Sequence, residues 1–285
     1  MGETSSSAGL PQLYGEHLVL GATFGDDAVV ISYAHETPEG IASSYQATLC
    51  DLTHMQVLYF AGLDAPAFAQ AAFAQSPLSV GSCSFGAVLT GDGNVASIPL
   101  LARTGKQEYV ALDPSPRADV LSAWLSFLSN VSSDGYAPYA HMQTQDVTAT
   151  HVVLLLQGQA APRVLEDYLG NQHLPGTGCV ASVLLDRIPC VVLNTGNRDL
   201  PVFLIMVPPH AAVALWRSLL SFTEVTPVGT EAFSRMAARR HPWYDKLCHA
   251  GSSLSLPAKD LTRWGLVRNT DDYVGARALR SRTEV

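Results

Sequence analysis

The sequence predicts an α+β fold of two duplicated half-domains, each with the element order β-α-β-β-β-α, whose helices pack on mixed or antiparallel sheets. One observation is an apolar strand at 57–61 that runs through a glycine turn into a helix, a unit that returns about 95 residues later at 152–169. The other is a strand, a proline break and a tryptophan-bearing helix at 108–128, echoed at 203–222. Strands and helices that alternate in this way fit helices covering sheets.

Residues 1–12 are expected to be a disordered lead, and residues 13–130 to form the first half-domain. In this half, the helix after the strand at 57–61 begins next to Asp64, a residue type that caps helix N-termini, and a proline follows in the first turn. Gly-Asp-Gly-Asn at 91–94, between two apolar runs, is typical of a β-hairpin. The predicted elements are strands at 28–34, 57–61, 86–91, 95–102 and 107–112, and helices at 13–22, 65–75 and 117–128.

A stretch rich in Ser, Gly and Pro at 129–140 marks the boundary, and the second half-domain is predicted over 140–228. Residues 229–285 form a C-terminal helix-loop segment that completes the body. The predicted elements are strands at 151–156, 179–185, 189–193 and 202–207, helices at 162–169, 210–222 and 231–240, a mostly looped stretch at 242–273, and a last helix from 273. Arg239 and Arg240 are interpreted as the solvated end of a helix, where cations are favoured.

Composition excludes several classes of function. The net charge is −8, whereas a nucleic-acid partner requires clustered Lys and Arg. The five cysteines include no CxxC pair and the nine histidines no HExxH motif, so the sequence predicts neither a disulfide framework nor a metal site. No apolar run reaches the roughly 18 residues of a membrane span, and the polar N-terminus lacks the apolar core of a secretory signal. The expected location is the cytoplasm, with no membrane partner.

Several short motifs connect the sequence to a known family through their order and spacing. They include LY with His17 near the start, DLTHM at 51–55, LLLQGQA at 154–160, PVG at 227–229, WG at 264–265 and YVG at 273–275. In these motifs the chain resembles the folate-dependent aminomethyltransferases, the T-protein of the glycine cleavage system and its relatives. The resemblance covers residues 13–280 and implies two half-domains interlocked around a central cavity that binds tetrahydrofolate. In the family a small β-barrel follows this body, and that barrel is expected to be missing here.

The sequence departs from the family at the positions that carry its chemistry. The family's catalytic aspartate belongs to a pair of acids just after the hairpin turn, and here Ser97 and Ile98 match that pair. Asn197 stands where the resemblance implies a pterin-binding glutamate, and Ala237 where it implies an arginine. A serine carries no charge beside the folate amine, and an amide forms weaker hydrogen bonds than a carboxylate. The ordinary aminomethyl transfer is therefore expected to be altered or lost, and no catalytic residue is assigned.

The resemblance implies five cofactor-binding residues in the cavity: Met55, Phe85, Asp113, Asn197 and Trp264. Met55 and Trp264 match family residues, Phe85 keeps the ring of a tyrosine, and Asp113 replaces an asparagine. A second interpretation stays open for most of them. Met55, Phe85 and Trp264 are also plausible as ordinary core residues, and Asp113, which precedes prolines, as a turn residue.

Two classes of function follow from the resemblance. The first is a tetrahydrofolate-binding protein that transfers a methyl or aminomethyl group, with a small methyl donor as its second substrate. The alternative is a non-catalytic member that acts as a folate-binding or protein-interaction scaffold, or that completes the active site of a partner protein. The charge of the cavity distinguishes them, because a carboxylate from Asp113, Asp199 or Glu231 would restore an acceptor for the pterin. A lining of Ser97, Ile98 and apolar groups would not.

Overall fold

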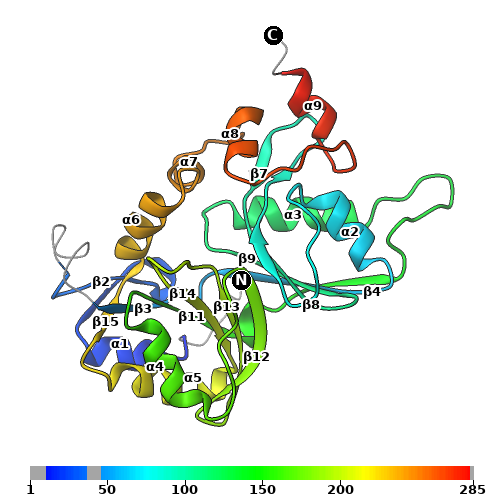
Figure 1. The fold of residues 1–285 in the computed structure, drawn as a ribbon. Helices are drawn as coiled ribbons and strands as arrows, with labels where there is room; N and C mark the ends of the chain where they lie inside the picture. Colours follow the sequence, from blue (N-terminus) through cyan, green and yellow to red (C-terminus); the bar gives the residue numbers. More distant parts are fainter. Residues whose placement is uncertain (1–10, 37–45, 283–285) are drawn as a thin grey trace, which may run out of the picture.

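In the computed structural model, which describes residues 11–36 and 46–282, two β-sheets carry the fold (Figure 1). One sheet has the strand order β10 (Met142–Asp146), β4 (Gln56–Gly62), β9 (Glu108–Asp113), β8 (Leu100–Gly105) and β5 (Cys83–Phe85). The other has the order β12 (Cys179–Leu185), β13 (Ile188–Asn194), β14 (Val202–Val207), β11 (Val152–Gln157), β3 (Ala47–Asp51) and β15 (Val225–Val228). Two short pairs are β1 (Ala22–Phe24) with β2 (Val30–Tyr33), and β6 (Val88–Leu89) with β7 (Val95–Ser97).

The two sheets repeat one arrangement, which confirms the predicted duplication. Strands β4, β9, β8 and β5 occupy the same successive places in their sheet as β11, β14, β13 and β12 in the other. The helices repeat as well: α2 (Ala65–Ala72) follows β4 as α4 (Ala161–Leu169) follows β11, and α3 (Ala118–Ser129) follows β9 as α5 (Pro209–Leu220) follows β14. The strand pairs between described residues are antiparallel except for β15 beside β3, so the prediction of mixed and antiparallel sheets is also confirmed.

The half-domains are interlocked because each gives one strand to the other. Strand β3 precedes β4 in the chain but pairs with β11 in the six-stranded sheet. Strand β10 precedes β11 but pairs with β4 in the five-stranded sheet. The two exchanged strands hold equivalent places, each beside the first strand of the opposite half. Separating the halves would therefore break both sheets.

The sequence pattern did not reveal the exchanged strands. Strand β10 has the polar sequence MQTQD and is mostly exposed, so it lacks the apolar alternation that marks a strand. Strand β3 is buried but spans only five residues, Ala47–Asp51. Strand β15 at the sheet edge contains Pro227, a residue type that argues against an interior strand. These three strands form because of their backbone hydrogen bonds to neighbouring strands, not because of a local sequence pattern.

The two sheets also meet edge to edge. The backbone N–H of Cys83 donates to the carbonyl of Gly178 at 2.8 Å, and that of Val180 donates to Gly81 at 2.9 Å. Ser82 and Cys179 form an antiparallel bridge at the same place. This contact joins β5 to β12 and holds the half-domains together on the side opposite the exchanged strands.

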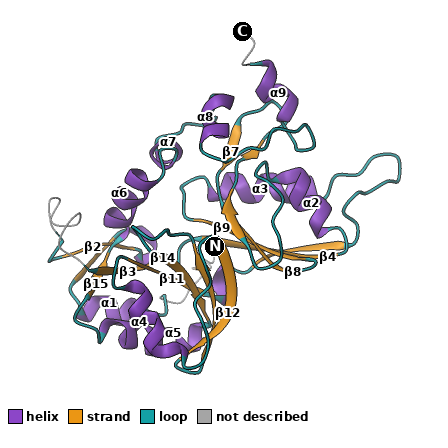
Figure 2. Cartoon of the chain, viewed as in Figure 1, coloured by secondary structure: helices purple, strands orange, loops and turns teal. Residues whose placement is uncertain are grey.

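Buried apolar side chains of the described residues form three clusters, two under the helices and one between the half-domains. Helices α4 and α5 cover the six-stranded sheet, and α2 and α3 cover the five-stranded sheet (Figure 2). Strand β11 shows how a central strand serves two clusters: Leu154 and Leu156 face the helices, whereas Val153 and Leu155 face the central cluster. Such two-sided burial gives the continuous apolar run that the sequence shows at 152–156.

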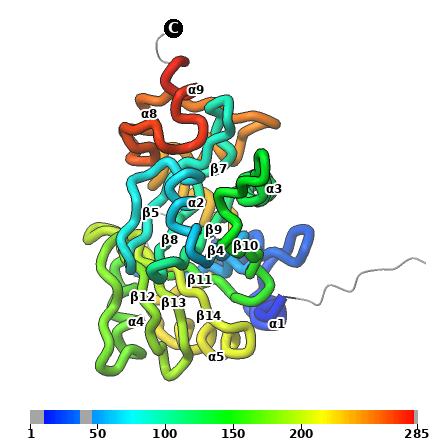
Figure 3. Tube along the Cα trace, turned by 90° about the vertical axis from the view of Figure 1, so that its right-hand side faces the viewer, coloured from blue at the N-terminus to red at the C-terminus, as the bar shows by residue number. Residues whose placement is uncertain are grey.

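The C-terminal segment runs along one side of the molecule, from the six-stranded sheet to the β6–β7 hairpin (Figures 1 and 3). It contains α6 (Thr230–Arg240), α7 (Tyr244–Cys248), α8 (Ala258–Arg263) and α9 (Ala276–Ser281). The N–H of Val95 donates to the carbonyl of Leu254 at 2.7 Å, which ties the hairpin to this segment. The predicted loop at 242–273 thus includes two short helices, α7 and α8, whose length gives no clear periodicity.

The N-terminal helix α1 (Tyr14–Val19) is shorter than predicted because strand β1 already begins at Ala22. Its buried His17 lies 2.9 Å from a carboxylate oxygen of Asp51 and 2.7 Å from the hydroxyl of Tyr33. The predicted disordered lead falls largely outside the described residues. Among the described residues, no helix is long and apolar enough to cross a membrane.

Candidate functional site

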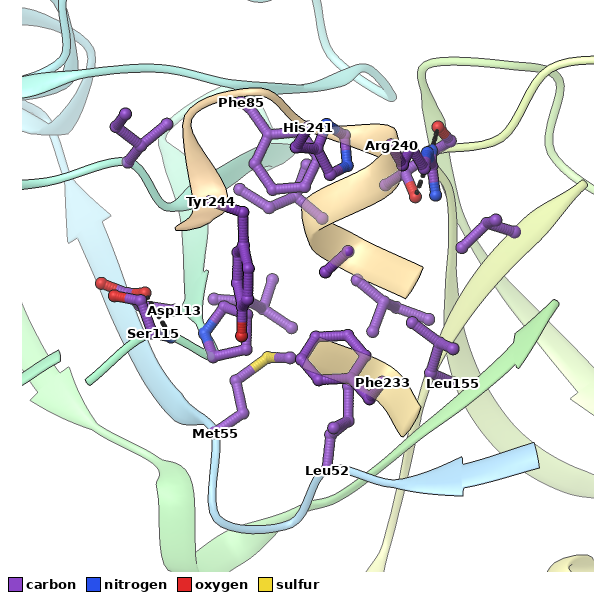
Figure 4. Close-up of a pocket in the computed structure, with 18 of the residues that line it drawn as sticks. Leu52, Met55, Phe85, Asp113, Ser115, Leu155, Phe233, Arg240, His241 and Tyr244 are labelled. Carbon is purple, nitrogen blue, oxygen red and sulfur yellow. Dashed lines mark hydrogen bonds between the residues drawn. The ribbon is translucent and has the colours of Figure 1, made fainter. Parts of the chain in front are cut away.

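A cavity lies between the two half-domains, beside helices α6 and α7 (Figure 4). The turn after β3 contributes Leu52 and Met55, β5 contributes Phe85, and β11 contributes Leu155. Phe233 projects from α6. The site therefore depends on the strand exchange. Strand β3 belongs to the first half but pairs with β11 of the second, and the turn that follows it places Leu52 and Met55 at the cavity.

The cavity is narrow and its walls are mostly apolar. Its volume is about 50 Å³, room for a few water molecules, whereas ligand pockets usually offer about 300–1,000 Å³. The Tyr244 ring forms part of its wall, edge-on to Phe233 with ring centroids 5.9 Å apart. Burial raises the pKa of the Tyr244 phenol well above its usual range, so this hydroxyl remains protonated. A ligand larger than a few atoms requires side chains such as Tyr244 to move.

A buried acid, Asp113, lies at one edge of the cavity. The end of β9 places it there, and its side chain is only 1% exposed. Ser97 donates its hydroxyl to one carboxylate oxygen at 2.5 Å, and the backbone N–H of Ser115 donates to the other at 2.9 Å. Burial raises the pKa of Asp113, while these hydrogen bonds and the nearby Arg117 partly oppose that rise. Asp113 is thus a buried carboxyl group at the cavity edge, and each of its two oxygens already accepts a hydrogen bond from the chain.

A cationic side chain, Arg240, lies on the side of the cavity away from Asp113 (Figure 4). Its guanidinium donates to the backbone carbonyl of Thr195 and, at 3.3 Å, to the Thr195 hydroxyl. Burial lowers the pKa of Arg240 to about 10, so it stays charged at neutral pH. The next residue, His241, has its ring 4.8 Å from those of Phe85 and Trp243. The cavity therefore has an acidic and a basic side separated by apolar and aromatic groups.

The structure brings three of the five predicted cofactor-binding residues to the cavity: Met55, Phe85 and Asp113. Trp264 does not line it; the ring is half-buried against the edge of the central cluster, with the Arg263 guanidinium 5.8 Å from its centroid. Asn197 does not line it either. Its side-chain oxygen accepts from the backbone N–H groups of residues 199 and 200, so it closes an exposed turn on itself. Their binding roles stay predictions that the cavity geometry does not support.

Of the three acids that could restore an acceptor for the pterin, the structure places one at the cavity. Asp113 is at the cavity, whereas Asp199 is exposed in the turn with Asn197, and Glu231 is exposed and paired with Arg235. Ile98 lines the cavity, whereas Ser97 does not and reaches it through its hydrogen bonds to Asp113 and Ser115. Asp113 is therefore the carboxylate among the described lining residues.

The sequence analysis missed Arg240, which it interpreted together with Arg239 as a solvated helix end. Arg239 is exposed, but Arg240 points toward the cavity. The signal was available in the spacing: Arg240 lies three residues after Ala237 on α6, and both residues line the cavity. It also missed Tyr244, because α7 was not predicted as a helix.

We expect Asp113→Asn to lose less stability than the parent protein when the pH rises from acid to neutral. The folded-state pKa of Asp113 lies above its unfolded value of 3.8, so the native state holds the proton more tightly. The stability that the protonated Asp113 contributes is then fully present below the unfolded-state pKa. This contribution is lost as the pH rises through the folded-state pKa. The amide cannot ionise, so the variant avoids this loss. Urea unfolding at acid and neutral pH checks the difference, and an equal pH dependence in both proteins would contradict it.

The fold defines the class of protein. Two interlocked half-domains of this kind also form the aminomethyltransferase T of the glycine cleavage system from Bartonella henselae, whose crystal structure superposes with a TM-score of 0.76. The alignment covers 96% of this chain and 74% of that chain at 23% identity, which shows the shared fold. The family model of the GCVT N-terminal domain matches residues 27–246, and the chain belongs to this family.

Curated relatives agree with this assignment. The aminomethyltransferase of Rubrobacter xylanophilus is 25% identical over 283 residues, which cover 95% of this chain and 72% of the relative. Those of Streptomyces coelicolor and Saccharopolyspora erythraea are 26% and 28% identical over 210 residues. That match covers 71% of this chain but 54% and 55% of these two relatives, little more than half of their length.

Proposed function

We propose that the cavity between the half-domains binds a reduced folate of the tetrahydrofolate type and that the protein takes part in one-carbon transfer, of a methyl or aminomethyl group. The observation that carries this proposal is the position of Asp113, the carboxylate among the described lining residues, on a cavity walled largely by apolar groups such as Met55 and Phe85. Membership of the GCVT N-terminal domain family supports it. A small methyl donor would be the second substrate.

The chemistry of the lining fits a pterin. A pterin is a flat ring with amide and amino donors, and a buried carboxylate accepts hydrogen bonds from such donors strongly. Aromatic walls such as Phe85 and Phe233 suit the flat ring. The folate would supply the carbon carrier, while the chain binds and orients it and Asp113 holds or moves a proton. Since the cavity is narrow, binding requires its side chains to move apart.

The acid of this site is then Asp113 in place of the family's catalytic aspartate at position 97. The two positions are in direct contact, because the Ser97 hydroxyl donates to Asp113 at 2.5 Å. A proton-handling group is retained within one hydrogen bond of the position that lost it. Altered transfer chemistry follows, since the charge approaches the ligand from β9 instead of β7.

One observation favours a second candidate, a non-catalytic folate-binding or protein-interaction scaffold. The cavity holds only about 50 Å³, and the Tyr244 ring narrows it from one wall. If the ring cannot move, the body would act through its surface, together with a partner protein. Ligand binding separates the two candidates directly.

We expect calorimetric titration with 5-formyltetrahydrofolate to show micromolar affinity, which Met55→Ala and Asp113→Asn each weaken about tenfold through lost packing or a lost charged hydrogen bond. Asp119→Asn is the matched control, because Asp119 is an exposed acid at the start of α3. No binding by the folded protein at high folate would overturn the proposal. Equal affinity in all variants would place the ligand elsewhere.

A further inference from the structure

Arg240 is a cation for which the described part of the chain supplies no anion. The partners of its guanidinium are the carbonyl and hydroxyl oxygens of Thr195, which are neutral. None of the ion pairs between described residues includes Arg240. A partly buried guanidinium has five donors and pairs best with a planar carboxylate or a phosphate. Its remaining donors are available to an anion in the cavity.

The acid of the cavity does not neutralise Arg240. Asp113 lies on the far side, and its oxygens are engaged by Ser97 and by the backbone N–H of Ser115 (Figure 4). Figure 4 shows Tyr244 and Phe233 between the two charged groups. A ligand that reaches Arg240 therefore presents its charged end there and its apolar part to the middle of the cavity.

The wall next to Arg240 is aromatic and uncharged. His241 lies against Trp243 with an interplanar angle of 27° and is packed beside Phe85. Burial, and then the charge of Arg240, lower the pKa of His241 to about 4, so it is neutral at physiological pH. Arg240 is thus the single cation among the described lining residues, beside flat rings that suit an aromatic or unsaturated body.

We propose that Arg240 and Thr195 form an anion subsite of the cavity and that its ligand is a carboxylate with an apolar, preferably aromatic, body. The carboxylate pairs with the guanidinium, and the body lies along Phe85 and Phe233. This inference deepens the proposed function and rests on it for the use of the same cavity. The carboxylate belongs either to the folate or to a separate small acid that acts as second substrate.

The test compares benzoate with benzamide, which have almost the same shape and differ in charge. We expect calorimetry or ligand-observed NMR to show that the protein binds benzoate about tenfold more tightly, the value of one charge-assisted hydrogen bond. Arg240→Gln is expected to remove this preference, and Arg240→Lys to restore part of it. Arg239→Gln, the exposed neighbour on α6, is the control and should keep the preference. Equal binding of both probes by the parent, or an unchanged preference in folded Arg240→Gln, would overturn the subsite.

The folate titration separates the two sources of the carboxylate and the two proposals. If Arg240→Gln weakens 5-formyltetrahydrofolate about tenfold, the folate's own carboxylate occupies the subsite. If folate affinity is unchanged while the benzoate preference is lost, the subsite holds a second, acidic substrate. If folate does not bind but the preference for benzoate depends on Arg240, the subsite stands and the proposed folate function fails.

Discussion

Replacing Gly158 with alanine is expected to lower the free energy of unfolding by about 3 kcal/mol or more, and Gly62→Ala is expected to do the same. These glycines are equivalent in the duplication, since each lies where the first strand of a half-domain, β11 or β4, turns into its helix. Each also faces the point where the exchanged strand enters. The two substitutions therefore test the strand exchange at both of its crossings.

The geometry at both positions excludes a side chain. Gly158 has φ +123°, and a Cβ built there would lie 2.4 Å from the carbonyl oxygen of Gln46 and 2.8 Å from the Cα of Ala47, at the start of β3. Gly62 has φ +131°, and its Cβ would lie 2.1 Å from the carbonyl oxygen of His141, just before β10. The obstacles are backbone atoms, which cannot move aside as the end of a flexible side chain does. Such φ values also strain any residue with a Cβ.

Urea unfolding of the parent protein, Gly158→Ala and Gly62→Ala checks the expectation, and Gly91→Ala is the matched control. Gly91 has open space around the added Cβ and a φ outside the positive region, so its change should stay within about 0.5 kcal/mol. Gly158→Ala with an unchanged midpoint would show that β3 does not pass as closely as the structure places it. A loss at Gly158 but not at Gly62 would limit the argument to one crossing.

The duplication was predictable and the exchange was not, for a physical reason. The paired apolar strands and the helices after them repeat in the sequence because each half buries the same faces. The exchange depends on β3 and β10, and β10 is a polar, exposed strand whose structure comes from its hydrogen bonds to β4. Local pattern carries no signal for a strand that is set by its partner.

The same limit applies to the site. Met55, Phe85 and Asp113 lie at the cavity because they stand next to strand ends that meet there, whereas their cofactor-binding roles stay predictions. Asn197 was expected there because it stands where the resemblance implies a pterin-binding glutamate. Its side chain instead closes its own turn, which an Asn can do and a glutamate does less readily. Arg240 was missed because two successive arginines at a helix end suggest solvent. The spacing from Ala237, three residues before Arg240 on α6, is the signal that distinguishes them.

Ser97→Asp is expected to destabilise the protein by about 3 kcal/mol at neutral pH, because it buries a second carboxylate against Asp113. Ser97 is fully buried, and its hydroxyl donates to Asp113 at 2.5 Å, so an aspartate there replaces a donor with a second acceptor. Two like charges at this separation cannot both ionise at low cost. The loss should shrink at acid pH, where both groups are protonated. In Ser97→Asn the new side chain has the size of an aspartate but no charge. This variant therefore separates the effect of the charge from the effect of the added volume.

The double variant Ser97→Asp/Asp113→Asn restores the polarity that the family resemblance implies, with the acid at 97 and the amide at 113. If the acid has moved across this hydrogen bond, the two substitutions compensate, and a double-mutant cycle should show a favourable coupling of about 2 kcal/mol. Additive losses, or a Ser97→Asn variant as unstable as Ser97→Asp, would contradict this account and leave the two positions as independent packing sites. Compensation would instead show that Ser97 and Asp113 form one unit. The acid that the sequence lacks at 97 would then be present, one hydrogen bond away, on β9.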